Sequence, residues 1–354
     1  MNEKLKLLEP VSLGGLKLSN RIFMSPLTRC RAESGRVPGR LMREYYTQRA
    51  AAGLIISEAT SITPMGVGYP DTPGIWSPEQ VTGWKEIVRA VHEAGSKMFL
   101  QLWHVGRVSD PFYLNGALPV APSAIAPQGH VSLLRPHRPF VTPRALERSE
   151  LPGIVAAYRQ GAANALEAGF DGVEIHGANG YLLDQFLQDS SNHRTDDYGG
   201  PVENRARLML EVADAVISVW GADRVGMHLA PHAPEHDMRD SNPAATFGYV
   251  ARELGRRHLG FLCVRETPGS SRLSAQLKQQ FGGFYVANDG FTRATGEQIL
   301  RQDEADAVAF GRLFIANPDL PSRFARNAPL NPPDPSTFFA SGPKGYTDYP
   351  ALAA

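Results

Sequence analysis

Cysteine is almost absent from this chain of 354 residues, which contains only Cys30 and Cys263. Two cysteines cannot cross-link so long a chain into a disulfide scaffold, so the composition favours a reducing compartment. Long apolar runs are also missing, because no stretch approaches the roughly 18 uninterrupted apolar residues of a membrane span. Residues 1–10 mix acidic and basic side chains and lack the apolar centre of a signal peptide. We therefore expect a cytoplasmic protein.

An excess of charge of either sign is missing as well. The 36 Lys and Arg residues balance 36 Asp and Glu residues, and no block of like charge stands out. Nucleic acids and anionic membranes attract basic surfaces, so we expect neither as a partner. The content of 42% hydrophobic and 20% charged residues is that of an ordinary globular core and surface. Barrels of α/β type reach this length undivided, so we expect one domain over residues 1–354.

Short apolar segments alternate along the chain with longer segments of helical period. The apolar segments are rich in β-branched and aromatic residues, as expected for strands buried on both faces. Eight strands are predicted, at 22–25, 54–58, 98–102, 172–175, 225–229, 261–264, 284–287 and 307–310. The predicted helices are 40–51, 78–94, 152–168, 202–220, 244–257, 272–280, 294–301 and 319–326. Eight such units predict an α/β fold, a single (β/α)8 TIM barrel.

Three further patterns bear on the architecture. A doubly wound open sheet is the alternative, but it favours a Gly-x-Gly-x-x-Gly turn after the first strand, where residues 26–29 read Pro-Leu-Thr-Arg. Residues 11–18 alternate around a Gly-Gly pair and predict an N-terminal β-hairpin that closes the bottom of the barrel. Residues 103–149 form a long, Pro-rich connection after strand 3. Such long loops are usually functional, so we expect a partial lid over the catalytic face.

The clearest chemical signal lies at the end of the fourth predicted strand. An apolar run ends in His176, and Asn179 and Tyr181 follow three and five positions later. The carboxyl ends of parallel strands are where such proteins place their chemistry. His and Asn can donate to a carbonyl oxygen, and a phenol can release a proton. The pattern indicates reduction of an activated double bond, although a strand-end His alone is more often a structural residue.

Motifs in order along almost the whole chain resemble the Old Yellow Enzyme family, FMN-dependent ene-reductases on a (β/α)8 barrel. The matching segments are 20–29 (NRIFMSPLTR), 57–60 (SEAT), 101–107 (QLWHVGR), 176–181 (HGANGY), 191–200 (SNHRTDDYGG), 203–205 (ENR), 309–312 (AFGR), 317–320 (NPDL) and 345–350 (GYTDYP). Each is weak alone, but together and after the right strands they are specific. The resemblance implies a flavin ene-reductase of the NADPH dehydrogenase type, similar to N-ethylmaleimide reductases.

The resemblance also implies roles for individual residues. His176 and Asn179 hold the carbonyl or nitro oxygen of the substrate, and Tyr181 protonates the α-carbon. Gly311 and Arg312 clamp the FMN phosphate after strand 8. The residues implied to bind FMN are Pro26, Leu27, Thr28, Ala59, Gln101, His228, Asp289, Gly290, Gly311 and Arg312. The residues implied to line the substrate pocket are Tyr69, Trp103 and Phe339.

Three positions depart from the family pattern. His228 stands where the family commonly has an Arg that contacts the flavin, and an imidazole carries charge only when protonated. Asp289 would lie beside the phosphate, so we expect its side chain to turn away and only backbone contacts to remain. Phe339 stands where several relatives have Tyr, which makes the predicted pocket less polar. Thr28 places the chain in the branch of the family that has Thr, rather than Cys, near flavin O4.

The expected enzyme is an NAD(P)H-dependent reductase with tightly, non-covalently bound FMN and ping-pong turnover. NADPH or NADH is the transient reductant, and the substrates are small electron-poor alkenes such as enones, maleimides and nitroalkenes. We expect a monomer or homodimer.

Two alternatives stay open. The departures at His228, Asp289 and Phe339 suit a flavin-binding barrel with degraded or redirected catalysis. A cofactor-free barrel lyase or hydrolase is disfavoured, because no Lys other than Lys97 is a candidate and Lys97 opens its strand rather than closing it.

A third pattern invites a metal interpretation. His232, His236 and Asp237 lie close together in sequence, but Pro231 and Pro234 interrupt any helix that could align them. We expect a solvated loop there and no metal site.

Overall fold

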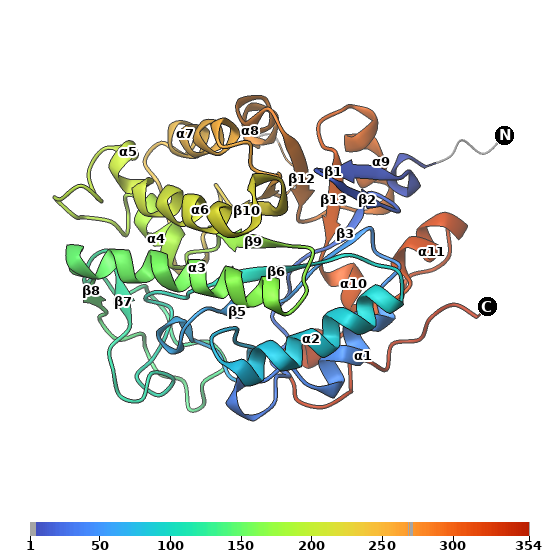
Figure 1. The fold of residues 1–354 in the computed structure, drawn as a ribbon, viewed down its shortest axis with the longest axis horizontal. Coiled ribbons are helices and arrows are strands. Elements are labelled where there is room, and N and C mark those ends of the chain that lie inside the picture. Colours follow the sequence, from blue (N-terminus) through green and yellow to red (C-terminus); the bar gives the residue numbers. More distant parts are fainter. Residues whose placement is uncertain (1–4, 268, 270–271, 354) are drawn as a thin grey trace.

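The computed structural model describes residues 5–267, 269 and 272–353. Its main sheet has the strand order β4-β3-β13-β12-β11-β10-β9-β6-β5, in which β5 is the two-residue strand Thr60–Ser61. The further pairing of β4 with β6 closes the sheet into a ring (Figure 1). All neighbouring strands in this ring run parallel. The wall strands are β3 (Ile22–Met24), β4 (Leu54–Ile56), β6 (Met98–Trp103), β9 (Gly172–His176), β10 (Val225–Leu229), β11 (Phe261–Arg265), β12 (Phe284–Asn288) and β13 (Ala307–Phe310). The predicted barrel is confirmed, with every strand within two residues of its expected bounds.

Helices cover the outside of the barrel. The long ones are α1 (Arg40–Gln48), α2 (Pro78–Glu93), α3 (Leu151–Glu167), α6 (Arg207–Trp220), α7 (Pro243–Arg256), α8 (Ser274–Phe281), α9 (Arg293–Arg301) and α11 (Leu320–Arg326). The predicted helix 202–220 is divided at Ala206, so that α5 (Val202–Arg205) precedes α6. The short helices α4 (Leu182–Leu187) and α10 (Arg312–Ala316) were not predicted. Within the described residues, no helix combines the length and apolarity needed to cross a membrane.

The strand residues alternate between two cores, as the pleat of a β-strand requires. Ile22, Met24 and their counterparts face the surrounding helices, whereas Phe23 points into the barrel. The interior cluster also contains Leu54, Ile56, Phe99, Phe261, Cys263, Val286, Ala307 and Ala309. The predicted hairpin is confirmed as β1 (Val11–Leu13) paired antiparallel with β2 (Leu16–Leu18). Its buried leucines, Leu13, Leu16 and Leu18, belong to the same interior cluster and therefore close the amino-terminal end.

The connection between β6 and α3 is not a plain loop. It contains a small parallel pair formed by β7 (Val120–Ala121) and β8 (Arg144–Ala145). Two of its apolar side chains, Leu133 and Phe140, pack against a cluster that includes Tyr69 and Trp103. The segment therefore covers the aromatic residues at the mouth of the barrel, as expected of a partial lid.

Candidate active site at the carboxyl ends of the strands

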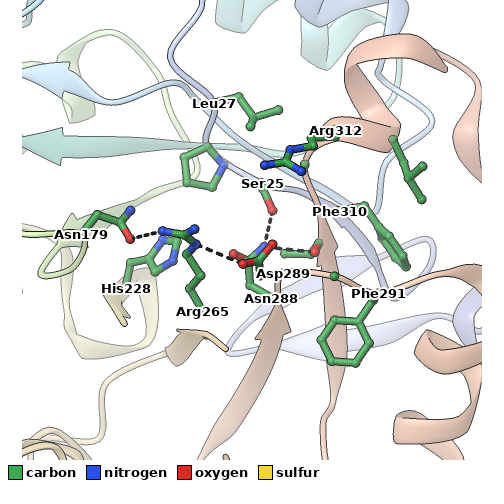
Figure 2. A pocket seen from close by; sticks show the side chains of 15 residues that line it. Ser25, Leu27, Asn179, His228, Arg265, Asn288, Asp289, Phe291, Phe310 and Arg312 are labelled. Atoms are coloured by element: carbon green, nitrogen blue, oxygen red, sulfur yellow. Dashed lines mark hydrogen bonds and ion pairs between the residues drawn. The ribbon is translucent and has the colours of Figure 1, made fainter. Parts of the chain in front are cut away.

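A cavity of about 400 Å³ opens at the carboxyl ends of the barrel strands. This volume lies within the roughly 300–1,000 Å³ typical of small-molecule and cofactor sites. Its lining comes from the segments that follow β3, β9, β12 and β13 and from the ends of β10 and β11 (Figure 2). The lining includes seven predicted FMN-binding residues, namely Pro26, Leu27, His228, Asp289, Gly290, Gly311 and Arg312. The sequence-based site is thus largely assembled in one place.

One end of the cavity is suited to an anion. The side chain of Arg312 is exposed to the cavity, and its guanidinium has no hydrogen-bond or ion-pair partner among the described residues. At Gly311, an added Cβ would lie 3.3 Å from Leu27 Cδ2, so glycine keeps the floor open next to the charge. Gly290 has φ +74°, a backbone conformation that favours glycine. An unpartnered cation between two open glycine backbones fits the phosphate of FMN.

The side chain of Asp289 turns away from this phosphate end, as expected. Its Oδ2 atom lies 3.3 Å from Nε of Arg265, with which it forms an ion pair. Asp289 itself has φ +81°, in the left-handed region that residues with a side chain rarely adopt. The negative charge of Asp289, which would repel a phosphate, is therefore paired with the positive charge of Arg265.

A buried polar cluster lies under the opposite end of the cavity. Nε2 of Gln101 is 2.7 Å from Oε2 of Glu174 and 3.4 Å from Nδ1 of His228. Nδ1 of His228 is also 3.5 Å from the same carboxylate, while its Nε2 has no partner within the described part of the chain. Burial, together with the nearby Glu174, raises the pKa of the Cys263 thiol. The orphaned Nε2 is an available contact for a polar edge of a ring placed in the cavity.

Four of the predicted catalytic and substrate-pocket residues gather in an aromatic cluster at the barrel mouth, namely Tyr69, Trp103, His176 and Tyr181. The Tyr181 ring lies 5.0 Å from the ring of Trp103 and 5.0 Å from that of His176, edge-on to both. The hydroxyls of Tyr181 and Tyr69 are 2.9 Å apart. The His176 ring stacks on that of His228 at 5.8 Å, which brings the substrate residues next to the FMN-binding set.

His176 is an uncharged donor. Burial lowers its pKa well below the usual value, and the neighbouring His228, Arg265 and His236 lower it further. The Ala178 N–H points at its Nδ1 from 3.4 Å, so the proton of the neutral ring belongs on Nε2. Burial likewise raises the pKa of Tyr181 well above its ordinary value, helped by Tyr69. Both side chains are therefore protonated where a donor is needed and carry no net charge.

The loop after β10 was predicted to be solvated, and for His236 this was wrong. Its Nδ1 lies 2.7 Å from the carbonyl oxygen of Asn179, and its Nε2 lies 3.5 Å from the Tyr69 hydroxyl. His236 and Glu235 therefore approach the site because the loop folds back over the turn that carries Asn179. His232, by contrast, is exposed, as expected of a solvated loop. Local sequence does not signal this, because the contact joins segments 57 residues apart.

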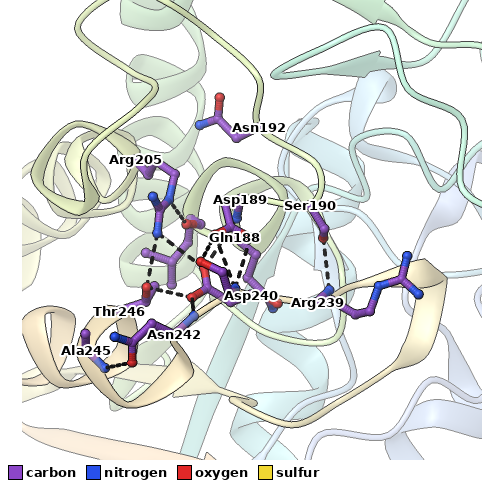
Figure 3. Close-up of polar contacts among 12 residues, drawn as sticks. Gln188, Asp189, Ser190, Asn192, Arg205, Arg239, Asp240, Asn242, Ala245 and Thr246 are labelled. Atoms are coloured by element: carbon purple, nitrogen blue, oxygen red, sulfur yellow. Dashed lines mark hydrogen bonds and ion pairs between the residues drawn. The ribbon is translucent and has the colours of Figure 1, made fainter.

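A polar network anchors this loop (Figure 3). Asp240, whose side chain is completely buried, pairs with Arg205 at 3.3 Å and accepts from the Thr246 hydroxyl at 2.9 Å. The backbone N–H of Arg239 donates to the Ser190 hydroxyl at 2.9 Å. These contacts tie the loop after β10 to α5, to α7 and to the segment after α4, so the loop is held on the carboxyl side of Glu235 and His236.

Eight of the predicted site residues do not line the cavity. Gln101 lies in the buried polar cluster, and Tyr69, Trp103, His176 and Tyr181 lie in the aromatic cluster, which leaves Ala59, Thr28 and Phe339. Ala59 instead belongs to the cluster of Tyr69 and Trp103. The Phe339 side chain is 45% exposed and is not part of the cavity wall. Thr28 is half-buried just beyond Leu27. Sequence reasoning missed Arg265, although a charged residue that ends the apolar run 261–265 was a signal that could have found it.

The geometry places a cavity of cofactor size beside a set of hydrogen-bond donors at the mouth of a barrel, and comparison with known proteins identifies the family. Residues 6–331 match the NADH:flavin oxidoreductase / NADH oxidase family. The chain is 46% identical to 12-oxophytodienoate reductase 1 of Oryza sativa subsp. japonica, over 98% of this chain and 93% of that protein. It superposes on morphinone reductase in complex with tetrahydroNAD with a TM-score of 0.95, at 49% identity over 99% and 98% of the two chains. For the Old Yellow Enzyme homologue from Zymomonas mobilis the TM-score is 0.96, at 44% identity over 98% and 100%.

The chain therefore belongs to the NADH:flavin oxidoreductase / NADH oxidase family, that of the Old Yellow Enzymes. It is a flavin-dependent NAD(P)H oxidoreductase that uses FMN and reduces activated carbon–carbon double bonds. The family and cofactor expected from the sequence are confirmed.

Proposed function

We propose that His176, Asn179 and Tyr181 carry out the reduction of small enones, maleimides and nitroalkenes at the mouth of the barrel. The observation that carries this proposal is the convergence of two neutral donors and a protonated phenol beside the cofactor cavity. The names of two relatives, 12-oxophytodienoate reductase and morphinone reductase, denote oxo compounds and support a carbonyl-activated alkene as substrate.

Arg312, Gly311 and the backbone of Gly290 hold the phosphate of FMN in this proposal, and His228 meets the ring. When bound, FMN supplies hydride chemistry between NAD(P)H and the alkene. Nε2 of His176 and Nδ2 of Asn179 donate to the substrate oxygen, where negative charge develops during reduction. Because these donors strengthen as charge builds, they stabilise the transition state more than the bound substrate.

Tyr181 supplies the proton to the α-carbon. Its raised pKa keeps the hydroxyl protonated at neutral pH, and the contact with Tyr69 fixes its direction. Trp103 and Tyr69 form the wall against which a planar alkene can lie. The lid segment with Leu133 and Phe140 limits access of water to this wall. NADPH and NADH are both suitable reductants for this site, residues 1–354 act as one domain, and the enzyme is a monomer or a homodimer.

The test is the variant Tyr181→Phe, followed by anaerobic stopped-flow of the two half-reactions. Flavin reduction by NADPH should keep its rate, whereas reoxidation by cyclohexenone should slow by about 10²–10⁴-fold, the usual contribution of a general acid. Tyr249→Phe, in the outer helix α7, is the matched control and should leave both rates unchanged. Equal slowing of both half-reactions would contradict the assignment of Tyr181 as proton donor.

A further inference from the structure

Arg265 ends β11 and points into the cavity beside Asn179 (Figure 2). Its Nη1 donates to Oδ1 of Asn179 at 2.8 Å, and its Nη2 donates to Oε1 of Glu235 at 2.8 Å. Its Nε faces Oδ2 of Asp289 at 3.3 Å. The planar fork is thus held between an amide and two carboxylates, and charge-assisted bonds of this kind are both strong and directional.

The contact fixes which way the Asn179 amide faces. A guanidinium has donors and no acceptor, so the amide oxygen must point toward it. The two N–H bonds of Nδ2 are then left for a ligand. An asparagine without such a neighbour can rotate by half a turn and offer either a donor or an acceptor.

The backbone of the same residue is held independently. Asn179 has φ +57°, and its carbonyl oxygen is contacted by Nδ1 of His236 at 2.7 Å. The next N–H, that of Gly180, donates to the buried carboxyl of Asp184 at 2.8 Å. With the backbone held in this way, the orientation of the Asn179 amide depends on its side-chain torsions, which the hydrogen bond from Arg265 restricts.

We propose that Arg265 is a positioning residue that locks the Asn179 amide as a donor, and thereby selects ligands that present an acceptor oxygen to the site. The class comprises carbonyl, nitro and phenolate oxygens, and ligands that present an N–H at this point are rejected. The charge of Arg265 also polarises the amide, which strengthens its N–H as a donor. The inference rests on the proposed function, in which Asn179 binds the substrate oxygen.

The experiment compares two ligands of similar size, 4-chlorophenol and 4-chloroaniline, titrated calorimetrically into the oxidised holoenzyme. Arg265→Met removes the donors and the charge, and Arg265→Lys keeps the charge but loses the fork. The pair Asn179→Ala and Arg265→Met/Asn179→Ala shows whether the arginine acts through the asparagine. Arg239→Met is the matched control, because it removes a nearby guanidinium whose side chain is 77% exposed.

Arg265→Met should weaken 4-chlorophenol binding about tenfold, the size expected for one lost charged hydrogen bond, and should narrow the preference over 4-chloroaniline. In the Asn179→Ala background it should add nothing. Arg265→Lys should recover part of the affinity, and Arg239→Met should match the unsubstituted enzyme. The inference would be overturned if Arg265→Met kept the parent's preference for 4-chlorophenol over 4-chloroaniline. It would also be overturned if Arg265→Met lowered the affinity for 4-chlorophenol equally in the parent and in Asn179→Ala.

The failure of the inference can be distinguished from the failure of the proposed function. If Asn179→Ala weakens 4-chlorophenol binding while Arg265→Met does not, only the positioning role is lost. If Asn179→Ala itself has no effect, the oxygen-binding role of Asn179 fails, and the inference fails with it. Should Arg265→Met not fold or not hold FMN, Glu235→Gln decides instead. Glu235→Gln removes the charge that pairs with Arg265 and should therefore reduce the preference for 4-chlorophenol over 4-chloroaniline, as Arg265→Met does. An unchanged preference in Glu235→Gln would overturn the inference.

Discussion

Two arginines line the same cavity and differ in how the protein holds them. Arg312 is exposed to the cavity, and its guanidinium has no partner among the described residues. Arg265 contacts Asn179, Glu235 and Asp289. An arginine left without protein partners is available to bind an anion, whereas one with its donors engaged organises its neighbours. The cavity therefore has a binding end and an organising end, and substitutions at the two ends should have different consequences.

The largest effect should come from Arg312→Met. If its guanidinium binds the FMN phosphate, losing a charge-assisted bond of roughly 1.5–3 kcal/mol weakens FMN binding about 10- to 100-fold. The measurement is the release of fluorescent FMN when the purified holoenzyme is diluted. Arg89→Met, on the outer face of α2, is the control and should retain FMN like the parent. If Arg312→Met retained FMN like the parent, Arg312 would not bind the phosphate, and the proposed difference between the two ends of the cavity would be contradicted.

His228→Arg tests the ring end of the cavity. A permanent positive charge next to the flavin favours its reduced, more negative form, so the midpoint potential should rise. A shift on the order of 30 mV corresponds to about 1.4 kcal/mol for a two-electron couple. Spectroelectrochemical titration measures it, with His193→Arg as a surface control. An unchanged potential would mean that the side chain at position 228 does not face the flavin.

Asp289→Asn should act in the opposite direction to Arg312→Met. It leaves part of the Arg265 charge unmatched, and an unmatched positive charge in the cavity lining attracts the phosphate. FMN binding should therefore tighten by about two- to threefold, and the gain should shrink at high salt because the groups are partly exposed to solvent. The same FMN-release assay at low and high ionic strength checks this. Weaker FMN binding in Asp289→Asn would show that its carboxylate helps to build the site.

The smallest effect concerns the protonation of His176. Burial is the main cause of its lowered pKa, and the positive charge of Arg265 is a further cause. Because a cation disfavours the imidazolium, Arg265→Met should raise the pKa of His176, which nevertheless stays below its ordinary value. Nitrogen NMR of labelled histidine across the pH range measures the shift, and Arg239→Met should give none. A lower pKa in Arg265→Met would contradict the proximity of the two side chains.

The barrel was predictable because its determinants are local. The apolar runs that became β10 and β13 have the predicted bounds, and the Gly-Gly hairpin is visible in eight residues of sequence. The Gly311-Arg312 pair was found because it follows the last strand directly. Such features need no knowledge of what lies opposite them in space.

The organising end of the cavity could not be predicted in the same way. Arg265, Glu235 and Asn179 lie on three segments far apart in sequence, and their contacts depend on how the loop after β10 folds back. That path is set by Arg205 and Asp240, which lie outside the site. Pattern and spacing identify strand ends, but they do not determine the course of a long loop. For the same reason His236 was assigned to solvent. Phe339 was assigned to the pocket wall from the family resemblance, and its side chain is instead 45% exposed.

The hairpin β1–β2 has a consequence for the order of events in turnover. Leu13, Leu16 and Leu18 fill the amino-terminal end of the barrel, so that among the described residues the cavity opens at the carboxyl ends of the strands. The reductant and the alkene must both enter through this opening, so the oxidised nicotinamide has to leave before the alkene can bind. NADPH and the alkene therefore compete for the same site, and excess NADPH should slow turnover.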